Sequence, residues 1–425
     1  MVRFGSTRIR TRRCLCTANL MTTPINAQVA TRRIGLEHLE QIKGKLGKQY
    51  AANRNFDYGA GHHDSVTNLS PWIRHRLVLE EEAVKVALSA HGYSRAEKFI
   101  QEIFWRTYWK GWLEMRPQVW RDFAVARDAE LKTWQNDSGY LSAISGETGI
   151  ECFDNWIREL KKENYLHNHA RMWFASIWIF TLRLPWVLGA NFFLQHLLDG
   201  DPASNTLSWR WVAGIQTRGK TYLARSENIS KYTQGRFDPK GQLATTARPI
   251  DAPLPPTPSV LKFDTQSIVE KPSLLLVTDD DMGLETANLP STNLAGIVSI
   301  NTARTRTPHG VGNEVADIID NALDAAVNNY AIKHQLSVYR IQPDDGRALL
   351  KLANQLSAQQ VIGLQIPIGP GRDAITDMMQ ELLSHKIVYS KIVRPWDRVC
   401  WPYAKAGFFR FRSSIPSMLG ALSLN

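Results

Sequence analysis

A proline-rich stretch divides this sequence into two parts with different patterns. Residues 239–272 contain Pro239, Pro249, Pro253, Pro255, Pro256, Pro258 and Pro272. Because proline fixes φ and lacks a backbone N–H, this stretch cannot continue a helix and is expected to form an extended linker. We therefore predict two structural domains, for which a chain of 425 residues is long enough.

The residues before the linker follow a helical pattern. Apolar side chains recur with a period near 3.6 in Arg95–Leu113, Ile150–Lys162 and Asn168–Leu184. Strand-like alternation is scarce in this part of the chain. We predict an all-α domain over residues 34–238.

The residues after the linker alternate between short apolar runs and helical patterns. The expected strands are Ser273–Thr278, Leu294–Ile300, Leu336–Ile341 and Gln360–Ile368. The expected helices are Asn313–Tyr330, Asp345–Ser357 and Arg372–His385. Such alternation predicts a smaller α/β domain over residues 273–425, Rossmann-like, with a mostly parallel sheet covered on both faces. Asp279–Asp281 would form a ligand-binding turn at the carboxyl end of the first strand.

Net charge and cysteine content indicate which partners and which cellular compartment suit this chain. The formal net charge of +11 suits a polyanion or a membrane surface as partner. No uninterrupted apolar stretch of about 20 residues exists, so no membrane span is expected. The four cysteines match no disulfide framework and no zinc spacing. We expect a monomer without a metal site, in a reducing compartment, the cytoplasm.

The first 33 residues are basic and lack acidic side chains. Three interpretations stay open for this leader, which is expected to be disordered: an organelle transit peptide if the source is eukaryotic, an arm for DNA phosphates, or an upstream start with Met21 as the true one. The leader contributes nothing to the fold prediction.

Three stretches carry unusual mixtures of side chains. On a helix Glu102, Trp105, Arg106 and Trp109 share one face. This stripe is either a surface ion pair beside half-buried indoles or the wall of a ligand pocket. The sequence NHARM places Asn168, Arg171 and Met172 on one face of a second predicted helix, which again fits either core packing or a pocket. The third stretch is DGDPASNTLSWRW, residues 199–211.

Taken together and in this order, the three stretches resemble the FAD-binding domain of the DNA photolyase/cryptochrome family. The resemblance covers about residues 45–240. It implies FAD as cofactor, and Arg171 paired with Asp199 beside it. The residues that it assigns to FAD are Tyr50, Thr67, Leu69, Ser70, Arg171, Asp199, Asp201 and Asn205. In the segment VTNLS, Val66 and Asn68 depart from the family's usual Thr and Arg, and Arg74 or Arg76 could compensate.

The same resemblance implies a pocket for a pyrimidine dimer flipped out of DNA. Its residues are Arg54, Glu102, Trp105, Arg106, Asn168, Met172 and Trp211. Six-four photolyases carry histidines where this chain has Asn168 and Met172, so the cyclobutane type is favoured. Trp134, Trp186 and Trp209 match the family's tryptophan chain for electron transfer, although each single indole also fits ordinary core packing.

The function implied is light-driven repair of cyclobutane pyrimidine dimers, with Glu102 and the three tryptophans as catalytic residues. Family members usually carry an α/β antenna domain before the flavin domain. Here an α/β domain follows instead, and it is either antenna-like, with a second chromophore, or purely structural. The alternatives are a cryptochrome-like photoreceptor that binds FAD without repair, and a FAD-free nucleic-acid-binding or scaffold protein.

Overall fold

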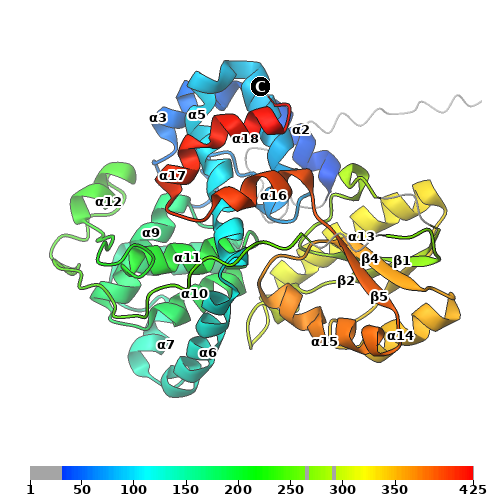
Figure 1. Ribbon diagram of the computed structural model, residues 1–425. Helices are drawn as coiled ribbons and strands as arrows, with labels where there is room; N and C mark the ends of the chain where they lie inside the picture. The colour runs from blue at the N-terminus through cyan, green and yellow to red at the C-terminus, as the bar shows by residue number, and fades with distance from the viewer. Residues whose placement is uncertain (1–30, 264–267, 290–292, 425) are drawn as a thin grey trace, which may run out of the picture.

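The computed structural model describes residues 31–263, 268–289 and 293–424. The basic leader therefore lies almost entirely outside the described residues. The helical domain comes first in the chain (Figure 1). Its helices are α2 (Arg32–Ile42), α3 (Lys48–Asn53), α4 (Ser70–Arg74), α5 (Glu80–Glu114), α6 (Pro117–Trp134), α7 (Ser138–Ser145), α8 (Glu151–Glu163), α9 (Asn168–Ser176), α10 (Trp186–His196), α11 (Pro202–Val212) and α12 (Ser226–Tyr232). The predicted all-α class of this part is confirmed.

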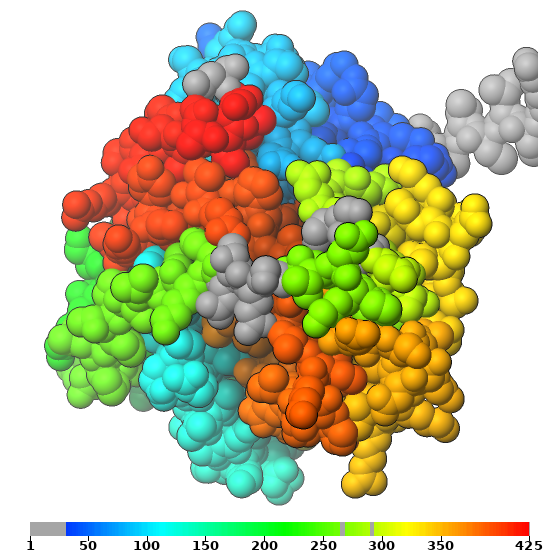
Figure 2. Space-filling view, turned by 45° about the vertical axis from the view of Figure 1, so that its right-hand side comes forward, coloured from blue at the N-terminus to red at the C-terminus, as the bar shows by residue number. Residues whose placement is uncertain are grey.

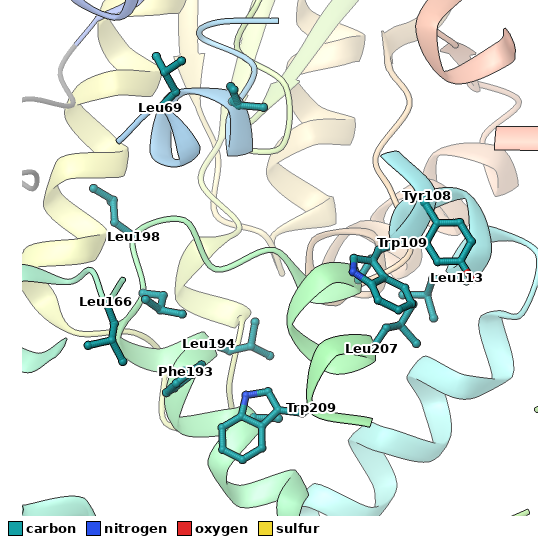
Figure 3. Packing of buried hydrophobic residues seen from close by; sticks show 14 of the residues in the cluster. Leu69, Tyr108, Trp109, Leu113, Leu166, Phe193, Leu194, Leu198, Leu207 and Trp209 are labelled. Carbon is teal, nitrogen blue, oxygen red and sulfur yellow. The ribbon is translucent and has the colours of Figure 1, made fainter. Parts of the chain in front are cut away.

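The long helix α5 is the central element of this domain. It begins after Leu79 with three glutamates, which suit the positive end of the helix dipole. At Gly92 the backbone adopts φ 70°, so α5 consists of two helices joined at a kink. The second half is mostly buried and carries Glu102 and Trp105. In Figure 3 Trp109 of this half points toward Leu207 of α11, in the core between the two helices.

A five-stranded sheet forms the second domain. The strands are β1 (Ser273–Thr278), β2 (Leu294–Ile300), β3 (Val338–Arg340), β4 (Gln360–Leu364) and β5 (Val388–Ile392), with helices α13 (Asn313–His334), α14 (Gly346–Gln355) and α15 (Pro370–Ser384). Their order is β3-β2-β1-β4-β5, and every pairing among the described strands is parallel. The predicted parallel α/β class is therefore confirmed.

Alternate residues of the central strand β1 serve two different cores. Leu274 and Leu276 pack in a core that also contains residues of α14 and α15. Leu275 and Val277 face the other way and join a core that includes α13 and continues into the helical domain. Period-2 alternation explains this division, because successive side chains of a strand point to opposite faces. The sheet is thus part of the same packed body as the helices.

The acidic turn after β1 lies against arginines of the helical domain. Arg74 contacts Asp280 at 2.8 Å, and Arg76 contacts Asp281 at 3.2 Å. Asp281 also binds Arg394 through two bonds of 2.6 and 2.7 Å. The hollow beside this turn is too small to admit a water molecule. The predicted ligand-binding turn is therefore occupied by an interface between the two domains.

The chain returns to the helical domain after β5. Helices α16 (Pro395–Cys400), α17 (Phe408–Ser413) and α18 (Ile415–Ala421) follow the sheet, and α16 and α17 pack on α5. In Figure 2 the residues of these C-terminal helices, in red, lie against the cyan residues of the helical domain. The last helices thus belong structurally to the helical domain, although the sequence assigned all of 273–425 to the α/β domain. Among the described residues, no helix combines the length and apolar character needed to cross a membrane.

Candidate flavin site

A buried ion pair joins α9 to the loop before α11. Arg171 donates to the Asp199 carboxylate at 3.0 Å, and Asp199 is only 4% exposed. Burial alone would raise the pKa of Asp199, but Arg171, Arg106 and the Ser70 hydroxyl together hold it below its usual value. The structure thus brings together three residues that the sequence assigned to FAD: Arg171, Asp199 and Ser70.

A second carboxylate in this region has two cationic neighbours. Asp201 accepts a hydrogen bond from the Ser204 amide at 2.7 Å and so caps α11. Its other oxygen lies 3.7 Å from both Arg106 and Lys110. Burial would raise the pKa of Asp201, but Lys110 and Arg106 lower it strongly, so the group stays ionised. Lys110 is 2% exposed. It was not selected from the sequence, although it directly follows Trp109.

The predicted phosphate segment lies directly before α4. Thr67, Leu69 and Ser70 surround Asn68, whose φ of 54° is left-handed. A ring nitrogen of His38 donates to the Thr67 carbonyl at 2.8 Å and fixes the segment to α2. Both neighbouring arginines are buried and paired with acids: Arg74 with Asp280, and Arg76 with Asp281 and Asp397.

A half-exposed ion pair lies on the kinked helix. Arg54 donates to Glu102 at 2.6 Å. Burial raises the pKa of Glu102, while Arg54 opposes this shift. Burial likewise raises the pKa of Tyr50, and the nearby Glu102 raises it further. Tyr50, Arg54 and Glu102 therefore lie close together.

One face of Trp105 is covered by the C-terminal part of the chain. The Phe408 ring stacks on it, with centroids 3.4 Å apart and planes inclined by 11°. The indole also contacts Tyr108 and Trp109 of its own helix. The sequence did not indicate Phe408, because the two residues are about 300 positions apart.

The remaining substrate candidates lie on helices that meet at α11. This helix packs against both α5 and α9. Asn168 is exposed, and Met172 and Trp211 are half-buried. Trp211 stacks on Tyr222 with centroids 5.6 Å apart. No direct contact is recorded among Glu102, Met172 and Trp211 in the described structure.

The three predicted electron-transfer tryptophans occupy different environments. Trp209 is buried and meets Trp178 edge to face at 6.3 Å. Trp186 packs on Phe123 at 5.7 Å, and Trp134 is half-buried at the end of α6. Trp178 was not identified from the sequence, where it looks like part of an apolar core helix. Near these indoles, the Asn205 amide donates to the Ala190 carbonyl at 2.8 Å.

Comparison with known families agrees with this geometry. Residues 99–249 match the family model described as the FAD binding domain of DNA photolyase. This part of the chain is a photolyase-type FAD-binding domain. Its cofactor is FAD.

Relatives of the photolyase-type domain support the assignment. A deoxyribodipyrimidine photo-lyase from Streptomyces griseus is 35% identical over 209 residues, covering 48% of this chain and 44% of the relative. One from Alkalihalophilus pseudofirmus is 30% identical over 222 residues, covering 51% and 45%. The chain thus spans less than half the length of these relatives. A cryptochrome structure from Synechocystis sp. PCC6803 matches with 24% identity and a TM-score of 0.38, over 48% of this chain and 43% of that one.

The residues of the photolyase-type domain fit FAD chemically. The Asp199 Oδ1 atom is buried and makes no hydrogen bond of 3.5 Å or less among the described residues, which leaves it able to accept one from a ligand. Arg171 and the hydroxyls of Thr67 and Ser70 supply donors for an anionic ligand. When FAD is bound, Arg171, Asp199 and Ser70 would hold it.

Proposed function

We propose that this protein is a light-driven deoxyribodipyrimidine photo-lyase that splits cyclobutane pyrimidine dimers in DNA. The names of the relatives and the match to the FAD-binding domain support this function. The formal charge of +11 suits DNA as the partner.

The burial pattern carries the proposal. Every residue assigned to the dimer is exposed or half-buried, whereas four of the eight residues assigned to FAD, Leu69, Asp199, Asp201 and Asn205, are buried. The other four, Tyr50, Thr67, Ser70 and Arg171, are half-buried. A flipped-out base enters an enzyme from the surface, while the cofactor lies beneath it. The greater average burial of the residues assigned to FAD agrees with this order.

Each surface residue has a defined task in the proposed reaction. Reduced FAD supplies the excited electron donor. Trp105 and Trp211 would stack on the bases, each contributing about 1–3 kcal/mol. Arg54 would contact a DNA phosphate, Glu102 would hydrogen-bond a base, and Arg106, Asn168 and Met172 would line the pocket. Trp134, Trp186 and Trp209 would conduct an electron from the surface inward.

A second function is favoured by one contact. Phe408 covers one face of Trp105. A photoreceptor that binds FAD and signals without repair has no need of a free indole face. In a photolyase, by contrast, a base would have to displace Phe408 or stack on the other face of Trp105.

A repair assay distinguishes the two functions. The purified chain, with its flavin reduced, is exposed to blue light with an oligonucleotide containing one thymine dimer, and the restored thymines are measured by chromatography. Light-dependent repair supports the proposal. A protein that contains flavin and changes its absorption in light, but leaves the dimer intact, is a photoreceptor instead. A colourless protein that refuses added FAD would contradict both functions.

A further inference from the structure

A buried group of metal-ligating side chains lies apart from the proposed DNA pocket. It joins the loop before the phosphate segment to helix α8. One donor atom from each of Asp57, His63 and Glu159 lies within 4.8 Å of the others. All three residues are at most 4% exposed. Glu163, one helical turn beyond Glu159, lies on the same side of α8.

Among the described residues, the imidazole of this group makes no hydrogen bond of 3.5 Å or less. The His63 Nε2 atom lies 3.6 Å from Glu159 Oε1 and 3.6 Å from Glu163 Oε2. Both ring nitrogens of His63 and both carboxylate oxygens of Glu159 are buried without a hydrogen-bond partner in the described structure. A fully buried imidazole and carboxylate rarely stay unsatisfied, because each lost hydrogen bond costs about 1–3 kcal/mol.

The separations suit a metal ion better than direct hydrogen bonds. A hydrogen bond between nitrogen and oxygen spans about 2.7–3.2 Å. Ligand atoms on a tetrahedral zinc ion, with bonds of about 2.0–2.1 Å, lie roughly 3.3–3.4 Å apart. The 3.6 Å separations around His63 Nε2 are close to this value.

The charge balance also favours a cation. Asp57, Glu159 and Glu163 are three carboxyl groups in a buried space, and Arg236 contacts Asp57 at 3.0 Å. A divalent ion would offset the negative charge that remains on these carboxyl groups.

We propose that Asp57, His63 and Glu159 bind one divalent transition-metal ion of the zinc class, with Glu163 beside His63. Imidazole and carboxylate oxygen are ligands that zinc accepts. The ion would fasten the loop after α3 to α8, and that loop leads directly into Thr67. This proposal differs from the sequence-based prediction of no metal site, which considered the spacing of the cysteines.

Zinc binding to the untagged full-length chain tests the proposal. After dialysis against a chelator, zinc is added, excess is removed, and zinc per chain is measured by mass spectrometry. We expect His63→Ala to lose one zinc equivalent. Glu159→Gln keeps the side-chain shape and should weaken zinc binding by at least about 100-fold. This loss is larger than the usual effect of replacing a residue that only hydrogen-bonds a metal ligand. His62→Ala and Glu151→Gln, at exposed neighbouring positions, serve as matched controls and should bind as the parent chain does.

Two outcomes would overturn the site. One is a parent chain that retains no zinc; the other is a His63→Ala chain that retains as much as the parent. Cobalt(II) provides an independent readout, because its visible bands report tetrahedral coordination. Those bands should be present in the parent chain and absent in the Glu159→Gln chain. Neither measurement depends on flavin or on repair.

Discussion

Phe408 lies face to face on Trp105, with ring centroids 3.4 Å apart. The two residues are about 300 positions apart in the sequence and meet because α17 packs back on α5. An aromatic pair of this kind contributes about 0.5–1.5 kcal/mol beyond its buried area. A base that stacks on the indole must therefore displace the phenyl ring or approach from the other face.

Removing the phenyl ring should strengthen binding of damaged DNA. In Phe408→Ala the face of Trp105 is free, so we expect the affinity for a dimer-containing oligonucleotide to rise several-fold. Fluorescence anisotropy in the dark measures this affinity. Phe409→Ala is the matched control, because Phe409 is 78% exposed on the same helix. Unchanged or weaker binding by Phe408→Ala in a folded protein would show that the ring does not compete with DNA.

Glu102 should affect chemistry more than binding. We expect Glu102→Ala to lower the repair yield per absorbed photon and to leave the dimer affinity within about twofold, because the carboxyl would act on the charge that develops during ring opening. Glu102→Gln, which still donates a hydrogen bond, should retain more of the yield. Equal losses of yield and affinity in Glu102→Ala would assign the residue to binding alone.

The tryptophan route can be traced one residue at a time. We expect Trp209→Phe to slow light-driven flavin reduction strongly while repair by prereduced protein persists. In the structure Trp209 contacts Trp178, whereas Trp186 contacts Phe123. Comparing Trp178→Phe with Trp186→Phe, by absorption during illumination, shows which indole comes next. If Trp209→Phe is reduced at the parent rate, the route does not pass through Trp209.

The turn after β1 should be essential for stability. Asp281 is 4% exposed and paired with Arg394 and Arg76. Replacing it by Asn leaves two buried guanidinium groups short of a counter-charge, so we expect a loss of about 3–5 kcal/mol, measured as a lower urea midpoint. The exposed pair of Arg304 and Asp317 provides the control, since Asp317→Asn should cost less than about 1 kcal/mol.

The metal-free chain should lose stability as pH rises because of Glu159. Its folded pKa of about 8 exceeds the ordinary value of 4.5, so the folded state holds more protons between these values. The free energy of unfolding then falls with pH in this window, by up to about 1.4 kcal/mol per unit. Asp57, Glu163, His63 and Arg236 face the same group. The difference between the parent chain and Glu159→Gln isolates its contribution, and a difference that does not vary with pH would contradict the assignment.

The sequence predicted those parts of the fold that local patterns determine. The strand β1 and the helix α8 were placed within one residue of their ends, because apolar periodicity depends on neighbours along the chain. The strand β5 was missed, since its sequence VYSKI lacks a clear apolar run. The pairing of Arg171 with Asp199, implied by family resemblance, is present in the structure.

Contacts between distant segments were beyond the sequence. Nothing in residues 74–76 or 279–281 indicates that arginines and aspartates meet across two domains. One feature of the sequence could have indicated the cluster around His63. Glu159 and Glu163 lie one turn apart on the buried face of α8, where unpaired carboxylates are costly.

The return of α16–α18 to α5 makes the α/β domain an insertion rather than an appendage. The chain leaves the helical domain before β1 and returns to it after β5. The sheet is therefore held by two chain connections and by the buried ion pair of Asp281 with Arg394. A shortened chain that stopped at the proline-rich stretch would not be a minimal flavin domain. It would expose Phe104 and Tyr108, which the last helices now cover, and so lose part of its own core.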